Sequence, residues 1–262
     1  MTRTFDVSGR LPDDVVEALQ VLDHHFREAR IRYVVIGALA RDAVTSLIQD
    51  RVPQRATKDV DLAVRVSSME QFRDVTSGLE RVGRHEHKFR VAGLEIDVVP
   101  FGDIAVDGRV EFRESVLDVH GLEEASQTSE RVKVTDSLSV DVASVAALTV
   151  LKILAWRDRK AWTNKDAIDL EHLFSAVQVE PYRDEIWSDE EAAELVEYDG
   201  TLLGAAWLGR QARRIADESS LAAVEGVLNR HLDALAHDMR APSASDQLRA
   251  FVHALHGRHL GS

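Results

Sequence analysis

The first half of the chain alternates apolar and polar residues in the way that half-buried strands do. Short runs rich in Val, Ile and Leu stop at glycine, serine or charged residues, which favours strands over helices. The pair Ala92-Gly93 is typical of a tight turn and predicts a β-hairpin. The predicted strands are residues 33–36, 59–66, 84–91, 94–99, 131–134 and 138–140.

Helical spacing of apolar residues separates these strands and then dominates the rest of the chain. Pro12 and the two acids after it favour a helix start, because proline fits the first turn and acids suit the positive end of the helix dipole. Ser67-Ser68 predicts a capped helix that runs to about Val82. The other predicted helices include residues 11–26, 39–49, 142–159, 201–215 and 220–236.

This change of pattern predicts an α+β protein made of two parts. We expect a mixed sheet flanked by helices in residues 1–141 and an all-helical lobe in residues 142–262. A chain of 262 residues is long enough for both parts to bury apolar cores. No stretch has the length of a membrane span or the pattern of a signal peptide, and there is no Cys. We therefore expect a cytoplasmic protein without disulfides or membrane association.

Two carboxylates, Asp59 and Asp61, lie in the predicted strand 59–66. The strand period of two places both on one face, about 6–7 Å apart at their Cα atoms. Like charges held side by side repel, which favours a cation between them, although a solvated edge strand would also explain them. Asp97 on strand 94–99 offers a third carboxylate. Three hard oxygen donors on neighbouring strands suit Mg²⁺ or Mn²⁺ and phosphoryl transfer.

A candidate phosphate site precedes these carboxylates. The apolar strand 33–36 ends at Gly37-Ala38, and a predicted helix follows. The first turn of a helix offers free backbone N–H groups and the positive end of the dipole, which suits a triphosphate. We predict that this turn and the metal-binding carboxylates face each other.

These residues carry a family resemblance. The order strand, Gly37-Ala38, helix, then the run Arg55-Ala56-Thr57-Lys58-Asp59-Val60-Asp61-Leu62 and finally Glu95-Ile96-Asp97 resembles the nucleotidyltransferase superfamily that includes DNA polymerase beta. The later blocks 151–159 and 164–170 are similar to the AbiEii branch, the toxins of type IV toxin–antitoxin systems. The resemblance covers roughly residues 30–175. It departs at Ala38, where the family usually has Gly or Ser, so this position offers phosphate only a backbone N–H.

The resemblance implies roles for further residues. An NTP substrate would lie against Gly37, Ala38, Arg55, Thr57 and Lys58. Lys152 would contact the triphosphate, and the resemblance favours this over the alternative from its sequence context, a lysine that extends its ammonium from a buried helix to solvent. Asp166 would support Lys152 or the nucleotide, or would simply serve the helix dipole as a first-turn acid. The implied catalytic set is Asp59, Asp61, Asp97, Lys152 and Asp166.

The charge pattern does not determine which molecule accepts the nucleotide. A net charge of −13, acidic on both sides of Asp141, counts against a general grip on nucleic acid. A local basic strip near the site could still guide an RNA end. By resemblance the acceptor is the 3′ end of tRNA rather than DNA, the effect is growth arrest, and the partner is a cognate antitoxin. The basic residues of the strip are Arg51, Arg55, Lys58, Arg81, Arg84, Lys88 and Arg90.

Two alternatives remain at this stage. Nucleotide transfer to a small-molecule hydroxyl, as in aminoglycoside-modifying enzymes, or to a protein side chain would keep the chemistry and change the acceptor. The acidic surface suits a cationic aminoglycoside. A module that binds nucleotide without turnover is the alternative outside enzymology, and Ala38 is its one sequence indication.

Histidines supply two weaker candidates. His253, His256 and His259 recur every three residues and could bind zinc, but a solvent-exposed terminal helix explains them better. His85 and His87 alternate on a predicted strand next to Asp97, where they could contact substrate or lie half-exposed.

Overall fold

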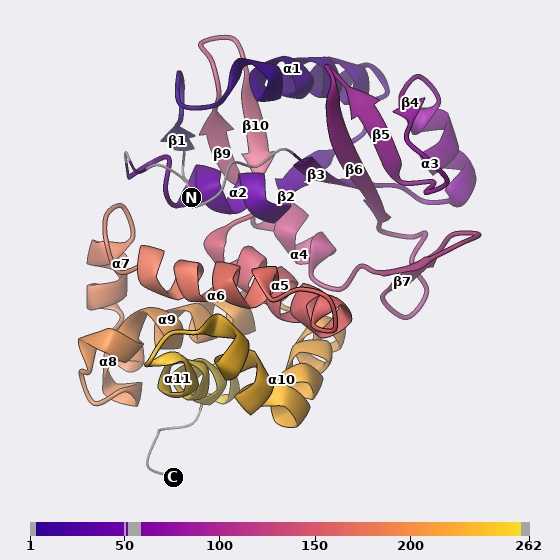
Figure 1. The fold of residues 1–262 in the computed structure, drawn as a ribbon. Helices are drawn as coiled ribbons and strands as arrows, with labels where there is room; N and C mark the ends of the chain where they lie inside the picture. Colours follow the sequence, from indigo (N-terminus) through magenta and orange to yellow (C-terminus); the bar gives the residue numbers. More distant parts are fainter. Residues whose placement is uncertain (1–3, 50, 52–58, 258–262) are drawn as a thin grey trace. The chain divides into compact units, whose positions relative to one another are not determined.

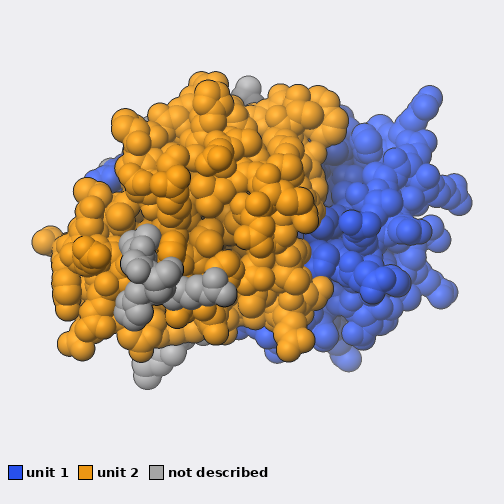
Figure 2. Space-filling view, turned by 90° about the horizontal axis from the view of Figure 1, so that it is seen from below, with its two compact units in different colours: residues 1–144 blue, residues 145–262 orange. Residues whose placement is uncertain are grey.

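The computed structural model describes residues 4–49, 51 and 59–257, which form two compact units, Met1–Ser144 and Val145–Ser262 (Figures 1 and 2). Unit 1 is built on a mixed sheet with helices on both faces, and unit 2 contains helices only among its described residues. The predicted α+β class, with a helical second part, is confirmed. No helix in the described part of the chain has the length and apolarity needed to cross a bilayer.

An eight-stranded sheet with the order β1-β9-β10-β2-β3-β6-β5-β4 forms unit 1 (Figure 1). The central strand β3 pairs antiparallel with β2 on one side and parallel with β6 on the other. A separate hairpin joins β7 (Arg109–Glu111) and β8 (Val116–Asp118). The strands of the large sheet are β1 (Thr4–Asp6), β2 (Tyr33–Ile36), β3 (Asp59–Arg65), β4 (Glu80–Arg81), β5 (Lys88–Val91), β6 (Leu94–Phe101), β9 (Glu130–Lys133) and β10 (Ser139–Val142).

The apolar face of the sheet is covered by α1 (Asp13–Glu28) and α3 (Met69–Thr76). Tyr33 pairs with Val64 and so shares its face, and its hydroxyl donates a 2.8 Å hydrogen bond to Asp23 of α1. Burial and this acceptor raise the pKa of the Tyr33 phenol, which keeps it a donor. His25 Nε2 lies 2.6 Å from the Val75 carbonyl oxygen, so α1 and α3 lie side by side.

The opposite face carries the polar residues of β3, and α4 (Leu122–Gln127) covers one end of it. Arg65 lies on this face because it is four residues from Asp61, and its Nε donates to Glu123 of α4 at 3.2 Å. Ala63, between them, is fully buried. At the other end of the strand on this face, Asp59 is exposed and Asp61 is half-buried.

Several predicted boundaries were wrong for local reasons. The helix predicted at 39–49 is α2 (Gly37–Val44), which begins earlier and ends where Thr45 leaves helical geometry and bonds back to the Arg41 carbonyl. The helix capped at Ser68 ends at Thr76 rather than Val82, because β4 follows it. The cap itself is confirmed, since Ser68 accepts from the Gln71 N–H at 3.1 Å.

Strand boundaries shifted as well. The strand predicted from Arg84 begins at Lys88, and the residues before it form a turn. The helix predicted from Val142 begins at Val145, because Val142 pairs with Val35 as the last residue of β10. The hairpin through Ala92-Gly93 is confirmed, with Val91 opposite Leu94.

Unit 2 buries its last helix instead of exposing it. Phe251 is fully buried in α11, and a Cβ on Gly209 of α9 would lie 2.4 Å from the Phe251 carbonyl oxygen. The prediction of a solvent-exposed terminal helix was therefore wrong. The helices are α5 (Val145–Arg159), α6 (Lys165–Ala176), α7 (Arg183–Ser188), α8 (Glu190–Leu195), α9 (Gly200–Ile215), α10 (Glu218–Met239) and α11 (Ala244–His256).

Candidate active site

A row of side chains crosses the middle of the sheet on its polar face. Asp61 of β3 lies directly opposite Asp97 of β6, and Asp97 lies directly opposite Lys88 of β5. Directly paired residues share a face of the sheet. Asp59, two residues before Asp61, therefore belongs to the same face and lies opposite Glu95. The structure thus places the three predicted carboxylates on one face of two neighbouring strands.

Gly37 lies against Asp61 at the start of α2. Its φ of +72° is in the left-handed region, which favours glycine. A Cβ at this position would lie 2.0 Å from Asp61 Oδ2, so a side chain here would overlap the carboxylate. The phosphate turn and the carboxylates are neighbours because β2, which leads into Gly37, pairs with β3 and places Ile36 opposite Asp61. Ala38, next in the helix, is half-buried.

Lys88, one of the residues of the predicted basic strip, belongs to this row. Its Nζ donates to both oxygens of Asp97, at 2.8 and 2.9 Å. The signal was available, because a two-residue turn at Ala92-Gly93 fixes a register in which residue 88 faces residue 97. A guanidinium nitrogen of Arg90 likewise lies 3.9 Å from a carboxylate oxygen of Glu80. These two cations are therefore engaged with carboxylates.

The donor chemistry of the row fits a hard divalent cation. Asp61 and Asp97 face each other at strand spacing, and Asp59 adds a third oxygen donor one step along β3. Within residues 4–49, 51 and 59–257, however, no group of three or more His, Cys, Asp and Glu is arranged to hold a metal ion. The Lys88 ammonium supplies the positive charge next to Asp97 here. The three other predicted nucleotide contacts, Arg55, Thr57 and Lys58, lie outside the described residues.

Lys152 and Asp166 meet inside unit 2, in a network with Asp169 and Arg159. Lys152 Nζ donates to Asp169 Oδ2 at 2.6 Å and to Asp166 Oδ1 at 3.2 Å. Arg159 donates to the same Asp166 oxygen at 2.8 Å. The Lys152 side chain is 8% exposed, and those of Asp166 and Asp169 are each 3% exposed. The interpretation of Lys152 as a lysine extending to solvent was wrong, because its ammonium is buried between two carboxylates.

His87 was predicted to be a half-exposed strand residue and is neither half-exposed nor in the strand. It is 8% exposed and lies in the turn before β5, with its ring centroid 5.6 Å from that of Phe112. Burial lowers the pKa of His87, which favours the neutral imidazole. Its carbonyl accepts from the Val98 N–H, next to Asp97 on β6, and the Asp97 charge offsets part of the lowering of the His87 pKa. His85 is exposed, and His259 lies outside the described residues.

The remaining histidines of the terminal repeat do not gather around a common point. His256 Nε2 lies 3.1 Å from Glu225. His253 has a buried Nδ1 without a hydrogen-bond partner in the part of the chain that the structure describes.

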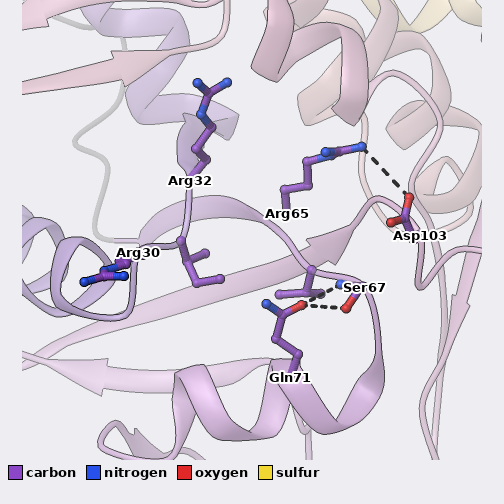
Figure 3. A pocket seen from close by; sticks show the side chains of 8 residues that line it. Arg30, Arg32, Arg65, Ser67, Gln71 and Asp103 are labelled. Carbon is purple, nitrogen blue, oxygen red and sulfur yellow. Dashed lines mark hydrogen bonds and ion pairs between the residues drawn. The ribbon is translucent and has the colours of Figure 1, made fainter.

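A hollow of about 370 Å³ in unit 1 lies at the other end of β3 (Figure 3). It is separated from Asp61 by four residues of strand, or about 13 Å. Figure 3 shows the guanidinium groups of Arg30, Arg32 and Arg65 pointing in different directions, with Arg65 turned toward Asp103. Since the cations do not converge on one point, we assign no ligand to this hollow.

Replacing Gly37 by Ala should destabilise unit 1 more than a matched change elsewhere. Left-handed backbone costs an alanine roughly 1–2 kcal/mol, and overlap with Asp61 adds a cost of about 1–3 kcal/mol. Gly93 is the control, because its φ is +82° and a Cβ there meets nothing within 4 Å. Denaturant unfolding of Gly37→Ala and Gly93→Ala measures both. Equal losses of unfolding free energy would contradict the close approach of Gly37 to Asp61.

Lys152→Met should lower the free energy of unfolding by about 3–5 kcal/mol, because it leaves two buried carboxylates without their shared cation. The matched control is Lys165→Met, since Lys165 is exposed and should change stability by less than about 0.5 kcal/mol. Thermal and denaturant unfolding measure the difference. A mild effect of Lys152→Met would mean that its ammonium is not held between Asp166 and Asp169.

Comparison with known proteins gives structural matches only. No protein-family model matches the chain, and no curated protein matches it. The antibiotic-resistance factor ANT(2'')-Ia is 15% identical over 71% of this chain and 98% of that one, with a TM-score of 0.42. A nucleotidyltransferase-like protein from Paracoccidioides brasiliensis is 14% identical over 87% and 92%, with a TM-score of 0.41. The Thermotoga maritima CCA-adding enzyme is 10% identical over 94% and 80%, with a TM-score of 0.29. At these values the matches do not assign the chain to a family.

Proposed function

We propose that this protein is a metal-dependent nucleotidyltransferase that moves a nucleoside monophosphate from an NTP to an acceptor hydroxyl. The observation that carries the proposal is the pairing of Asp61 with Asp97 on neighbouring strands, with Gly37 in contact range of Asp61. Carboxylates and a helix start that meet at one point offer the two things a bound metal–triphosphate needs, hard oxygen donors and backbone N–H groups.

Different groups of the chain would bind the metal, hold the phosphates and accept the proton. Asp59, Asp61 and Asp97 would hold Mg²⁺ or Mn²⁺, which when bound neutralises triphosphate charge and makes the α-phosphorus more electrophilic. Backbone N–H groups of Gly37 and Ala38 would hold the outer phosphates at the start of α2. Asp97 would accept the proton of the acceptor hydroxyl. A bond from the acceptor oxygen to the α-phosphorus forms as the bond to the pyrophosphate oxygen breaks, and pyrophosphate leaves with that electron pair.

Lys152 is the residue of unit 2 that we assign to the outgoing phosphates, with Asp166 as its support. Its ammonium is shared between Asp166 and Asp169, so this role requires one of those ion pairs to open. The assignment is supported by the sequence resemblance of the block that contains it. Arg55, Thr57 and Lys58 complete the proposed nucleotide contacts on the same ground.

The acceptor that we propose is the 3′ end of tRNA, and the cellular outcome is growth inhibition in the cytoplasm until a cognate antitoxin binds. The order of the motifs from residue 30 to residue 175 supports this choice, through the resemblance to AbiEii-type toxins. A cationic aminoglycoside is the second candidate acceptor, because the net charge of −13 favours a cation. A binding role without turnover is the third candidate, and the engagement of Asp97 by Lys88 favours it.

Asp61→Asn should abolish measurable transfer while the protein stays folded. Loss of one electrostatic contribution to phosphoryl transfer is expected to cost on the order of 10²–10³ in rate. The assay supplies each α-³²P-labelled NTP with bulk tRNA, an aminoglycoside or a cell lysate, and follows where the label goes. Asp103→Asn is the control, since Asp103 is 77% exposed and belongs to the hollow at the far end of β3.

The same assay separates the three candidates. Label on the RNA 3′ end supports the proposal, and label on the aminoglycoside replaces it by the second candidate. No transfer with any NTP, combined with undiminished growth inhibition by Asp61→Asn in cells, would leave only the binding role.

Lys88→Met should strengthen metal binding several-fold, because Asp97 then loses the ammonium that competes with the ion. Titration of nucleotide-free protein with Mn²⁺, followed by electron paramagnetic resonance, measures this without any turnover. Lys88→Arg keeps the charge and should bind Mn²⁺ as the wild type does. Identical affinities for the wild type, Lys88→Met and Lys88→Arg would show that Asp97 takes no part in metal binding.

A further inference from the structure

Unit 2 presents one tryptophan almost entirely to solvent. Trp162 is 82% exposed, whereas Trp156 and Trp207 are buried in the helical core. It lies in the connection between α5 and α6, which runs from Lys160 to Asn164. A ligand that covered the ring would bury a large apolar area, and burial of an aromatic side chain is worth several kcal/mol.

The connection that carries Trp162 is hydrogen-bonded into a fixed shape. The backbone N–H groups of Trp162 and Thr163 both donate to the Arg159 carbonyl, at 2.9 and 3.0 Å. In the amide orientation that satisfies both groups, the Asn164 oxygen accepts two hydrogen bonds from Arg240 of the α10 end, each of 3.1 Å. Arg159 is in turn tied to the buried Asp166. A ring on such a loop loses little entropy when a ligand stacks on it.

Three cations lie on or beside the connection that carries the ring. Lys160 and Lys165 are near Trp162 in sequence, and Arg240 is hydrogen-bonded to Asn164 of the same connection. Lys160, Lys165 and Arg240 are exposed, and Lys160 Nζ lies 5.1 Å from the centroid of the Trp156 ring. The loss of solvation lowers the pKa of His231 in α10, and the charges of Lys160 and Arg230 lower it further. Lys160 therefore lies near His231 and Arg230 of that helix.

Two nearby carboxylates are engaged locally. Asp158 accepts from Arg157 at 2.7 Å, and Asp238 accepts from Trp156 Nε1 at 2.9 Å. Asp158 is paired with a cation, whereas Asp238 keeps its charge because the indole is neutral. Lys160, Lys165 and Arg240 outnumber that one carboxylate, so on a chain of net charge −13 this connection carries a local excess of positive charge.

We propose that Trp162, Lys160, Lys165 and Arg240 form a platform for the single-stranded end of an RNA acceptor. A base stacks on the indole, and the cations hold the flanking phosphates. Stacking on an aromatic ring together with neighbouring cations is how proteins hold single strands without reading their sequence. The choice of RNA as the polymer rests on the proposed function. The platform is the surface to which that acceptor binds.

Two other ligands fit the surface less well. A cationic aminoglycoside would meet three like charges on or beside the connection that carries the ring. A protein partner would need apolar neighbours around the tryptophan, but the other large exposed apolar residues among those described in unit 2, Trp187 and Tyr198, belong to the α7–α9 segment. The flanking residues of Trp162 are small or charged instead.

Binding of a fluorescein-labelled 12-nucleotide single-stranded RNA, measured by anisotropy without NTP or metal, tests the platform. Trp162→Ala should weaken binding about 10-fold, as expected for the loss of one stacked base, and Trp162→Phe should restore most of it. Trp187→Ala is the matched control, since Trp187 is 54% exposed in the same unit, and it should bind as the wild type does. The double variant Lys160→Ala/Lys165→Ala should lower the slope of log affinity against log salt by roughly 1.4.

These measurements test RNA binding by the platform independently of nucleotidyltransferase activity. Equal affinities of the wild type and Trp162→Ala, or an equal loss in Trp187→Ala, would overturn the platform even if nucleotide transfer to RNA is found. RNA binding that depends on Trp162 in a protein without transferase activity would uphold the platform and reject the enzymatic proposal. In an active protein, Trp162→Ala should raise the KM for RNA about 10-fold and leave the KM for NTP unchanged.

Discussion

The structure of the candidate site depends on the side-by-side placement of Asp61 and Asp97. At strand spacing two carboxylates about 5 Å apart repel by about 3 kcal/mol at an effective dielectric constant of about 20. The sheet tolerates the pair because both lie on the accessible face and Lys88 donates to both oxygens of Asp97. The absence of a side chain at Gly37 leaves room for the Asp61 carboxylate on its other side. Charge balance and steric space at one point of the sheet thus explain a lysine, a glycine and two aspartates together.

Much of this arrangement could be predicted from the sequence because it follows from strand periodicity. Alternation placed Asp59 and Asp61 on one face, and the tight turn at Ala92-Gly93 determined which residue faces Asp97. Helix ends were predicted less well. Thr45 ends α2 through a side-chain bond to the Arg41 carbonyl of its own helix, and Val142 joins the sheet by pairing with the distant Val35. Periodicity carries no information on such partners.

The second part of the chain shows where sequence patterns fail in a different way. A lysine in an apolar helix is usually read as reaching solvent, yet Lys152 is buried because Asp166 and Asp169, three residues apart on the next helix, both face it. Recognising this required knowing which faces of α5 and α6 meet, and that depends on the whole helical unit. The same holds for α11, whose histidines suggested an exposed helix while its apolar face closes against α9.

The acidity of the chain does not by itself exclude an RNA acceptor. Phosphate contacts depend on the local density of cations, whereas the net charge mainly sets nonspecific adsorption and the rate of encounter. A small cationic surface with a stacking ring on an otherwise acidic protein would hold a single strand at one place and discourage its binding elsewhere. Carboxylates that bind a metal and cations that bind a phosphate lose affinity for those ligands when they pair with each other. Lys88 and Asp97 form such a pair. The exposed cations on and beside the Trp162 connection are only partly separated from carboxylates within their own unit, because Asp158 is paired with Arg157 whereas Asp238 accepts from the neutral Trp156 indole and keeps its charge.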